Sequence, residues 1–141
     1  MLKEYTLDNI YKGKLELGDD LLTKLTEIVQ EKEITTGKVT ALGAVKEAVV
    51  SFYDQNKQKY GAKNLAQPLE IINLIGNISL KDGEPIIHAH IALGDEDGML
   101  YGGHLEEGTI VFACEFIIEE YQGEPFRRGL DQETGLPLWV K

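Results

Sequence analysis

The sequence predicts an α+β fold, in which a mainly antiparallel β-sheet is covered by one main helix. Apolar residues recur at helical spacing in one segment, at Leu21, Leu22, Leu25, Ile28 and Val29. Elsewhere they alternate with polar residues or form short β-branched runs between Gly and Asp turns, which is typical of strands joined by hairpins. The 141 residues suffice for one domain with a real core but are few for two. We therefore expect a single domain over residues 1–141.

The first half of the chain is expected to contain the helix and three strands. Gly18, Asp19 and Asp20 supply a turn and an N-cap, and they place acids in the first turn of a helix that ends near residues 32–33. Residues 54–67 are polar and are interpreted as a loop. The strands are predicted at 5–17, at 36–45 with a glycine bend, and at 46–53.

The second half is expected to form hairpins followed by an irregular tail. Gly76 and Asn77 are interpreted as a turn or bulge between two short strands. Residues 123–141 show little periodicity, and we expect their apolar side chains to dock onto the body of the domain. The strands are predicted at 68–74, 78–80, 85–93, 99–105 and 109–121, with turns at 81–84 and 94–98.

All three histidines of the chain lie close together, at His88, His90 and His104. In an extended strand His88 and His90 share one face with Ala92. The other face reads as the core face and carries Ile87, Ala89, Ile91 and Leu93. Two imidazoles on one strand can converge on a cation, and a third can reach it from the next strand. Three imidazole nitrogens and a water are the open arrangement of catalytic zinc, so the pattern predicts a metal site. The alternative is three ordinary polar residues on a half-exposed strand.

Four neighbouring residues are assigned alternative roles. Gly102 and Gly103 allow the backbone before His104 to approach a metal or another strand, or they form an ordinary bulge or turn. Glu115 lies in an apolar run and is the candidate acid: it could orient a ligating imidazole or act as a general acid or base beside the metal. Otherwise, Glu115 lies on an exposed face or at a subunit contact. Cys114 is interpreted as a buried small hydrophobe, although it could be a fourth ligand.

Composition excludes several classes of function. The net charge of −10 and the presence of only two arginines, Arg127 and Arg128, argue against direct nucleic-acid binding, which depends on clustered cations. A single cysteine excludes an internal disulfide and fits a reducing compartment. No signal-peptide core or membrane-span run is present in the sequence. We therefore expect a cytoplasmic protein with no membrane association.

Several motifs together resemble the plant-and-prokaryote conserved (PPC or PCC) domain family. They are the Gly43-Ala44 step, the run 68–78, the His-Ala-His strand, and Gly102-Gly103-His104-Leu105 followed by Gly108. The resemblance implies a homotrimer whose three motif histidines hold a metal, usually zinc, which corresponds here to His88, His90 and His104. It also implies a fold similar to that of acetolactate decarboxylase, a three-histidine zinc enzyme. Plant members follow AT-hook segments that bind DNA, whereas this acidic chain has no Arg-Gly-Arg-Pro hook.

Two functions remain open at this level. The first is a small trimeric domain with a zinc site open to a small ligand, with lyase- or hydrolase-like chemistry and Arg127 and Arg128 as the guanidiniums available to an anionic substrate. The second is a protein-interaction or DNA-associated regulatory module in which the metal is structural. Nickel, iron and manganese remain alternatives to zinc, because imidazole suits several metals.

Overall fold

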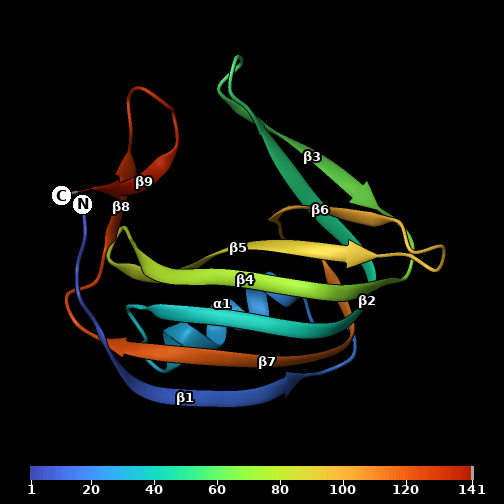
Figure 1. The fold of residues 1–141 in the computed structure, drawn as a ribbon, viewed down its shortest axis with the longest axis horizontal. Helices are drawn as coiled ribbons and strands as arrows, with labels where there is room; N and C mark the ends of the chain where they lie inside the picture. The colour runs from blue at the N-terminus through green and yellow to red at the C-terminus, as the bar shows by residue number, and fades with distance from the viewer. Residues whose placement is uncertain (141) are drawn as a thin grey trace.

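One nine-stranded sheet and one helix make up the fold of residues 1–140, the part of the chain that the computed structural model describes (Figure 1). The predicted α+β class, mainly antiparallel with one helix, is confirmed. No helix in this range is long and apolar enough to cross a membrane. The elements are β1 (Thr6–Leu15), α1 (Leu21–Glu31), β2 (Gly37–Asp54), β3 (Lys59–Leu65), β4 (Leu69–Lys81), β5 (Glu84–Gly94), β6 (Leu100–Leu105), β7 (Ile110–Gln122), β8 (Arg127–Leu130) and β9 (Pro137–Val140).

The long strand β2 organises the sheet because its two halves have different neighbours. Its first half lies between β7 and β4, and its second half pairs with β3 and β6. Since β4 also pairs with β5, and β5 with β6, the strands β2, β4, β5 and β6 close on themselves. Register shifts between Ala41 and Gly43 let β2 bend. Gly43 has φ +141°, and a Cβ there would run into the carbonyl oxygen of Ala113, so the bend requires glycine.

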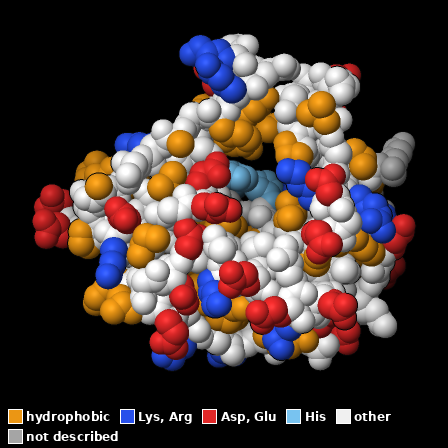
Figure 2. Space-filling view, turned by 180° about the vertical axis from the view of Figure 1, so that it is seen from behind, with side chains coloured by type: hydrophobic (Ala, Val, Ile, Leu, Met, Phe, Trp, Pro, Cys, Tyr) orange, Lys and Arg blue, Asp and Glu red, His pale blue; other side chains and the backbone are white. Residues whose placement is uncertain are grey.

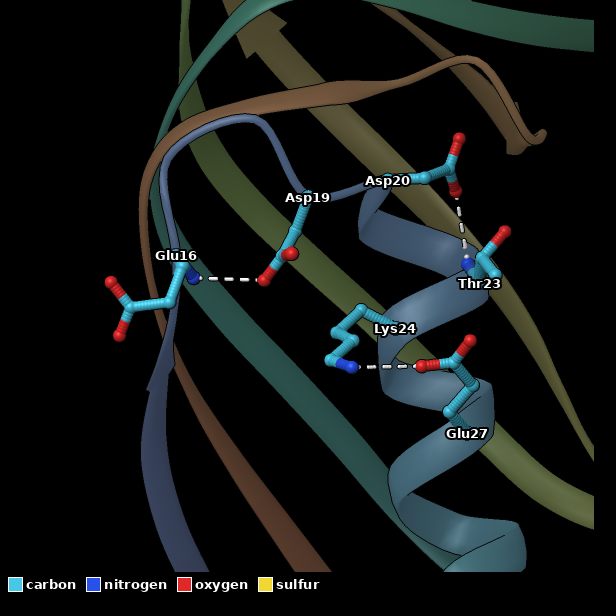
Figure 3. A network of polar contacts seen from close by, with 6 residues as sticks. All are labelled: Glu16, Asp19, Asp20, Thr23, Lys24 and Glu27. Atoms are coloured by element: carbon cyan, nitrogen blue, oxygen red, sulfur yellow. Dashed lines mark hydrogen bonds and ion pairs between the residues drawn. The ribbon is translucent and has the colours of Figure 1, made fainter.

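Helix α1 covers the inner face of the sheet and packs against β5. Three residues of its predicted stripe, Leu21, Leu25 and Val29, are fully enclosed, and the other two, Leu22 and Ile28, are partly buried. The expected acids in the first turn are absent, because Asp19 and Asp20 both precede the helix (Figure 3). Asp20 is the N-cap and accepts a hydrogen bond from the Thr23 amide at 3.0 Å, whereas Asp19 accepts one from the Glu16 amide at 2.9 Å.

Two segments form strands that local periodicity missed. Residues 54–67 were expected to be a loop, yet they contain β3, which pairs with β2 from Ala48↔Leu65 to Asp54↔Lys59. All β3 residues except Leu65 are exposed, so no buried face marks the strand in the sequence. The tail is not irregular either: β8 and β9 form a hairpin, and β8 adds to β4 in parallel.

Gly76 and Asn77 do not form a turn, because β4 is continuous through them from Leu69 to Lys81. A Cβ on Gly76 would lie 2.8 Å from both the Ala89 Cβ and the His88 carbonyl oxygen. The glycine therefore allows β4 and β5 to approach closely. The predicted hairpin turn at 81–84 is confirmed, with φ of 55° at Asp82 and 92° at Gly83.

The outer face of the sheet, opposite α1, is left open by the described residues. Along β4 and β2 it exposes large apolar side chains, including Ile75 at 51% and Leu42 at 59%. Strand pairing continues this face toward the histidines. Successive partners across the sheet are Lys12, Ile117, Thr40, Ile75, His90 and His104.

Candidate metal centre

The three histidines converge where β5 and β6 pair. His88 and His90 project from one face of β5, while the predicted core face of that strand is buried. His104 stands on β6 directly opposite His90. Each histidine offers one ring nitrogen such that all three nitrogens lie within 4.8 Å of one another. Figure 2 shows the imidazoles at the bottom of a hollow bordered by a Lys or Arg side chain.

Gly102 and Gly103 explain how β6 brings His104 to this position. A Cβ on Gly102 would lie 2.7 Å from the carbonyl oxygen of Ile91 on β5. A Cβ on Gly103 would lie 2.7 Å from the carbonyl oxygen of Ser51 on β2. The two glycines therefore allow β6 to lie close to both β5 and β2. They form no turn, because β6 is continuous through them.

The surroundings of His88 and His104 favour the neutral form of both imidazoles. Burial, together with the positive charge of the nearby Arg128 guanidinium, lowers the pKa of His88 to about 4. Burial also lowers the pKa of His104, against an opposing effect of the Glu106 carboxylate. Neutral imidazole has the lone pair that a metal needs. In addition, the buried Nδ1 atom of His104 has no hydrogen-bond partner among the described residues. An orphaned nitrogen beside two further imidazoles fits a bound metal ion.

Arg128 brings the C-terminal hairpin into the site. Its side chain is half-buried, and its NH2 nitrogen lies 3.3 Å from the Nδ1 atom of His88. The guanidinium also donates to Ser79 and Asn77 of β4, at 2.9 Å in each case. The sequence marked Arg128 only as one of two available guanidiniums; its place beside His88 follows from the pairing of β8 with β4.

Tyr60 and Glu106 border the site on the side of His104. The Tyr60 ring centroid lies 5.2 Å from that of His104. Glu106 accepts a hydrogen bond from the Ser51 hydroxyl, and its charge acts on both His104 and Tyr60. Sequence reasoning missed both residues: Tyr60 lies in the segment taken for a loop. The only available signal for Glu106 was its position two residues after His104.

Glu115 and Cys114 lie apart from the histidines within the chain. Glu115 is exposed on β7, which is separated from β5 by β2 and β4. Three strand spacings correspond to about 14 Å, so Glu115 neither orients a histidine nor serves as the acid beside it in the same chain. Glu115 is exposed in the single chain, which fits both of its alternatives, an exposed face and a subunit contact. Cys114 is buried, which raises the pKa of its thiol to about 11, and it is not a fourth member of the histidine cluster.

An antiparallel sheet with one covering helix and three converging imidazoles defines a class of β-rich candidate metalloproteins. Comparison with known families agrees with this description: residues 2–122 match the Plants and Prokaryotes Conserved (PCC) domain. The chain therefore belongs to the PCC domain family, as its motifs predicted.

Solved structures share the whole fold. A metal-containing protein of Archaeoglobus fulgidus is 40% identical, with a TM-score of 0.95 over 100% of this chain and 99% of that one. A plant- and prokaryote-conserved protein of Pyrococcus horikoshii is 35% identical, with a TM-score of 0.93 over 100% and 98%. A candidate DNA-binding protein of Bacteroides thetaiotaomicron is 27% identical, with a TM-score of 0.87 over 96% of each chain.

Among curated proteins, the chain resembles part of the bifunctional protein GlmU of Synechococcus, with 30% identity over 128 residues and 89% of this chain. The chain spans only 19% of the length of the two curated relatives of this name.

Proposed function

We propose that the protein is a small metal-binding domain in which His88, His90 and His104 hold one zinc ion per chain and leave a coordination position open to a small ligand. The observation that carries the proposal is the convergence of three ring nitrogens within 4.8 Å, at a site where the buried Nδ1 atom of His104 has no hydrogen-bond partner among the described residues. The metal-containing relative from Archaeoglobus supports it. Zinc is favoured over nickel, iron or manganese because an all-imidazole donor set with one free position is typical of open zinc sites.

The open position implies lyase- or hydrolase-like chemistry. A bound zinc supplies a Lewis acid that polarises a carbonyl oxygen or lowers the pKa of a coordinated water. Of the acidic residues, Glu106 is the best placed to move a proton, because its carboxylate acts on His104 and is half-buried at the edge of the site. We therefore propose Glu106, in place of Glu115, as the general acid or base beside the metal.

The open outer face supports a homotrimer of single-domain chains. Ile75 lies opposite His90, and Leu42 lies two residues along β2 from Thr40, the other partner of Ile75; both apolar side chains would be covered by neighbouring copies. A self-association of this kind buries apolar surface that the described residues leave uncovered. The single cysteine is buried, consistent with the proposed cytoplasmic location.

Metal content and solution mass test the proposal together. Protein purified without a histidine tag is measured by elemental mass spectrometry and by light scattering. We expect about one zinc per chain in a trimer. His90→Ala should lose the metal, whereas Glu115→Gln, on the same face but distant, should retain it. Full zinc retention by His90→Ala refutes the site. A Leu42→Lys variant that remains trimeric refutes the proposed interface.

The second candidate function is an interaction module with a structural metal. The candidate DNA-binding protein from Bacteroides, 27% identical, favours it. The charge of −10 opposes direct binding to phosphates and favours a basic protein partner. A salt-titrated gel shift distinguishes a DNA partner from a protein partner. Sub-micromolar DNA affinity would support the DNA-associated role. Its absence, together with one stoichiometric partner in a pull-down, would support an adaptor.

A further inference from the structure

We propose that Arg128 binds the carboxylate of a small organic acid in the cavity beside the histidines, and that a second oxygen of the same molecule meets the metal. The inference rests on the proposed function for its metal contact and names the ligand class of the same site. In this proposal Arg128, which lies on the β8–β9 hairpin, binds the ligand next to the three histidines of β5 and β6.

The first observation is that the Arg128 charge has no carboxylate partner. The chain carries 24 acidic residues, yet none of the ion pairs among residues 1–140 involves Arg128. Its hydrogen-bond partners are neutral: the Ser79 hydroxyl, the Asn77 side-chain oxygen and the Pro137 carbonyl oxygen. A half-buried cation held only by neutral groups remains unneutralised, and a bound anion would remove this cost.

The second observation is that metal binding releases a donor of Arg128. The 3.3 Å contact of NH2 with the Nδ1 atom of His88 is a hydrogen bond only when Nδ1 carries the lone pair. A neutral imidazole has one such nitrogen. If Nδ1 binds the metal, the lone pair is used; if Nε2 binds it, Nδ1 carries the proton. In both cases the contact with Arg128 is lost and an N–H of NH2 becomes free.

The freed N–H on the NH2 nitrogen of Arg128 and an N–H on its NH1 nitrogen can together bind one carboxylate. The NH1 nitrogen donates to Pro137 at 3.0 Å and has a second N–H. One N–H on each terminal nitrogen is the arrangement that binds a carboxylate with two parallel hydrogen bonds. The Trp139 ring, with its centroid 5.8 Å from the guanidinium carbon, limits the rotation of the fork.

The cavity fits a small molecule with a short carbon chain. Arg128, His88 and His104 line a space of about 210 Å³, smaller than the usual range for drug-sized ligands. Lys81 adds a positive charge, and Tyr60 contributes an aromatic wall. A phosphate would need donors for three oxygens, whereas most of the remaining wall is apolar. The apolar wall consists of Ile86, Ile87, Leu136, Pro137 and Leu138.

Calorimetric titration with glycolate tests the inference, because glycolate carries a carboxylate and one further oxygen. Ethylene glycol, of similar size but without a carboxylate, is the matched probe. Zinc-loaded wild-type protein should bind glycolate and not ethylene glycol. Arg128→Gln should weaken glycolate binding about tenfold to hundredfold, the range expected for lost charge-assisted hydrogen bonds. Arg127→Gln removes the same charge from the exposed neighbouring position and should leave the affinity within about twofold.

Zinc content, measured in every variant, separates this inference from the proposed function. Arg128→Gln should retain its zinc, since Arg128 is not a ligand. If the wild-type protein holds no zinc, the proposed function fails. Glycolate binding by the metal-free protein that still depends on Arg128 would then support the carboxylate site alone. If Arg128→Gln does not fold, Arg128→Lys and Arg127→Lys replace the pair, because lysine keeps the charge but loses the fork.

Three results overturn the inference. They are equal glycolate affinity in the Arg128 variant and the wild type, no glycolate binding by either the zinc-loaded or the metal-free protein, and Arg128-dependent binding of inorganic phosphate that is tighter than that of glycolate.

Discussion

Replacing Asp20 by alanine should destabilise the protein by more than the loss of an ordinary helix N-cap, because Asp20 also accepts a hydrogen bond from outside the helix. The two carboxylate oxygens of Asp20 accept different hydrogen bonds, of which Figure 3 shows the one from the Thr23 amide. Oδ1 accepts from the Thr23 amide at 3.0 Å and caps the helix, which contributes about 1 kcal/mol. Oδ2 accepts from the Gly108 amide at 2.6 Å, between β6 and β7, and a hydrogen bond to a charged group contributes about 1.5–3 kcal/mol. We therefore expect Asp20→Ala to lower the free energy of unfolding by about 2.5–4 kcal/mol.

Two further variants separate these contributions in urea unfolding followed by far-UV circular dichroism at one fixed protein concentration. Asp20→Asn keeps an acceptor for the cap, since asparagine caps as well as aspartate, but offers no second acceptor to Gly108. It should fall between Asp20→Ala and the wild type. Glu27→Ala, which removes only the exposed pair with Lys24, is the control. A loss below about 0.5 kcal/mol for Asp20→Ala, the range of ordinary surface changes, would refute the reasoning.

Three other perturbations have defined outcomes. Gly76→Ala places a Cβ 2.8 Å from the His88 carbonyl oxygen and should cost about 1–3 kcal/mol in urea unfolding, together with reduced zinc retention; wild-type values of both would contradict the close approach of β4 and β5. The pKa of His88 is about 4 in the folded protein and lies near 6.5 in the unfolded chain, so the unfolded chain takes up the proton first as the pH falls. The free energy of unfolding of the metal-free protein should therefore decrease as the pH falls from about 6.5 to about 4. His88→Asn should reduce this dependence on pH, measured by urea unfolding at several pH values. An unchanged dependence would exclude His88 as its source. Burial raises the pKa of the Cys114 thiol to about 11, so it should react with a thiol reagent at pH 8 only upon unfolding; rapid modification of the native protein would refute its burial.

The location of the centre on paired strands has a consequence for its chemistry. His90 and His104 are direct partners in the β5–β6 ladder, and glycines at 102 and 103 hold that ladder close to its neighbours. Backbone hydrogen bonds therefore fix the spacing of the imidazoles before any metal binds. For a metal held by these histidines, such preorganisation would favour one coordination geometry and limit rearrangement of the imidazoles.

Local patterns in the sequence were sufficient for the helix and for the strand that carries His88 and His90. The helical stripe at Leu21, Leu25 and Val29 and the alternation around the His-Ala-His strand each reflect one buried face. The same alternation predicted that His88 and His90 share a face, and the tight turn at 94–98 predicted that the next strand returns beside it with His104. These features depend on neighbours within a few residues, so the sequence contains the information directly.

Only the tertiary structure decided which other residues join the histidines. Arg128 lies 40 residues from His88 and reaches it because β8 adds in parallel to the edge of β4. Tyr60 arrives on β3, whose residues are nearly all exposed and leave no hydrophobic period to detect. Conversely, the apolar run around Glu115 suggested it as the acid beside the metal, but the order of the strands places β2 and β4 between Glu115 and the histidines. Strand order and the pairing of exposed edges depend on contacts between distant segments, which the periodicity of a single segment does not record.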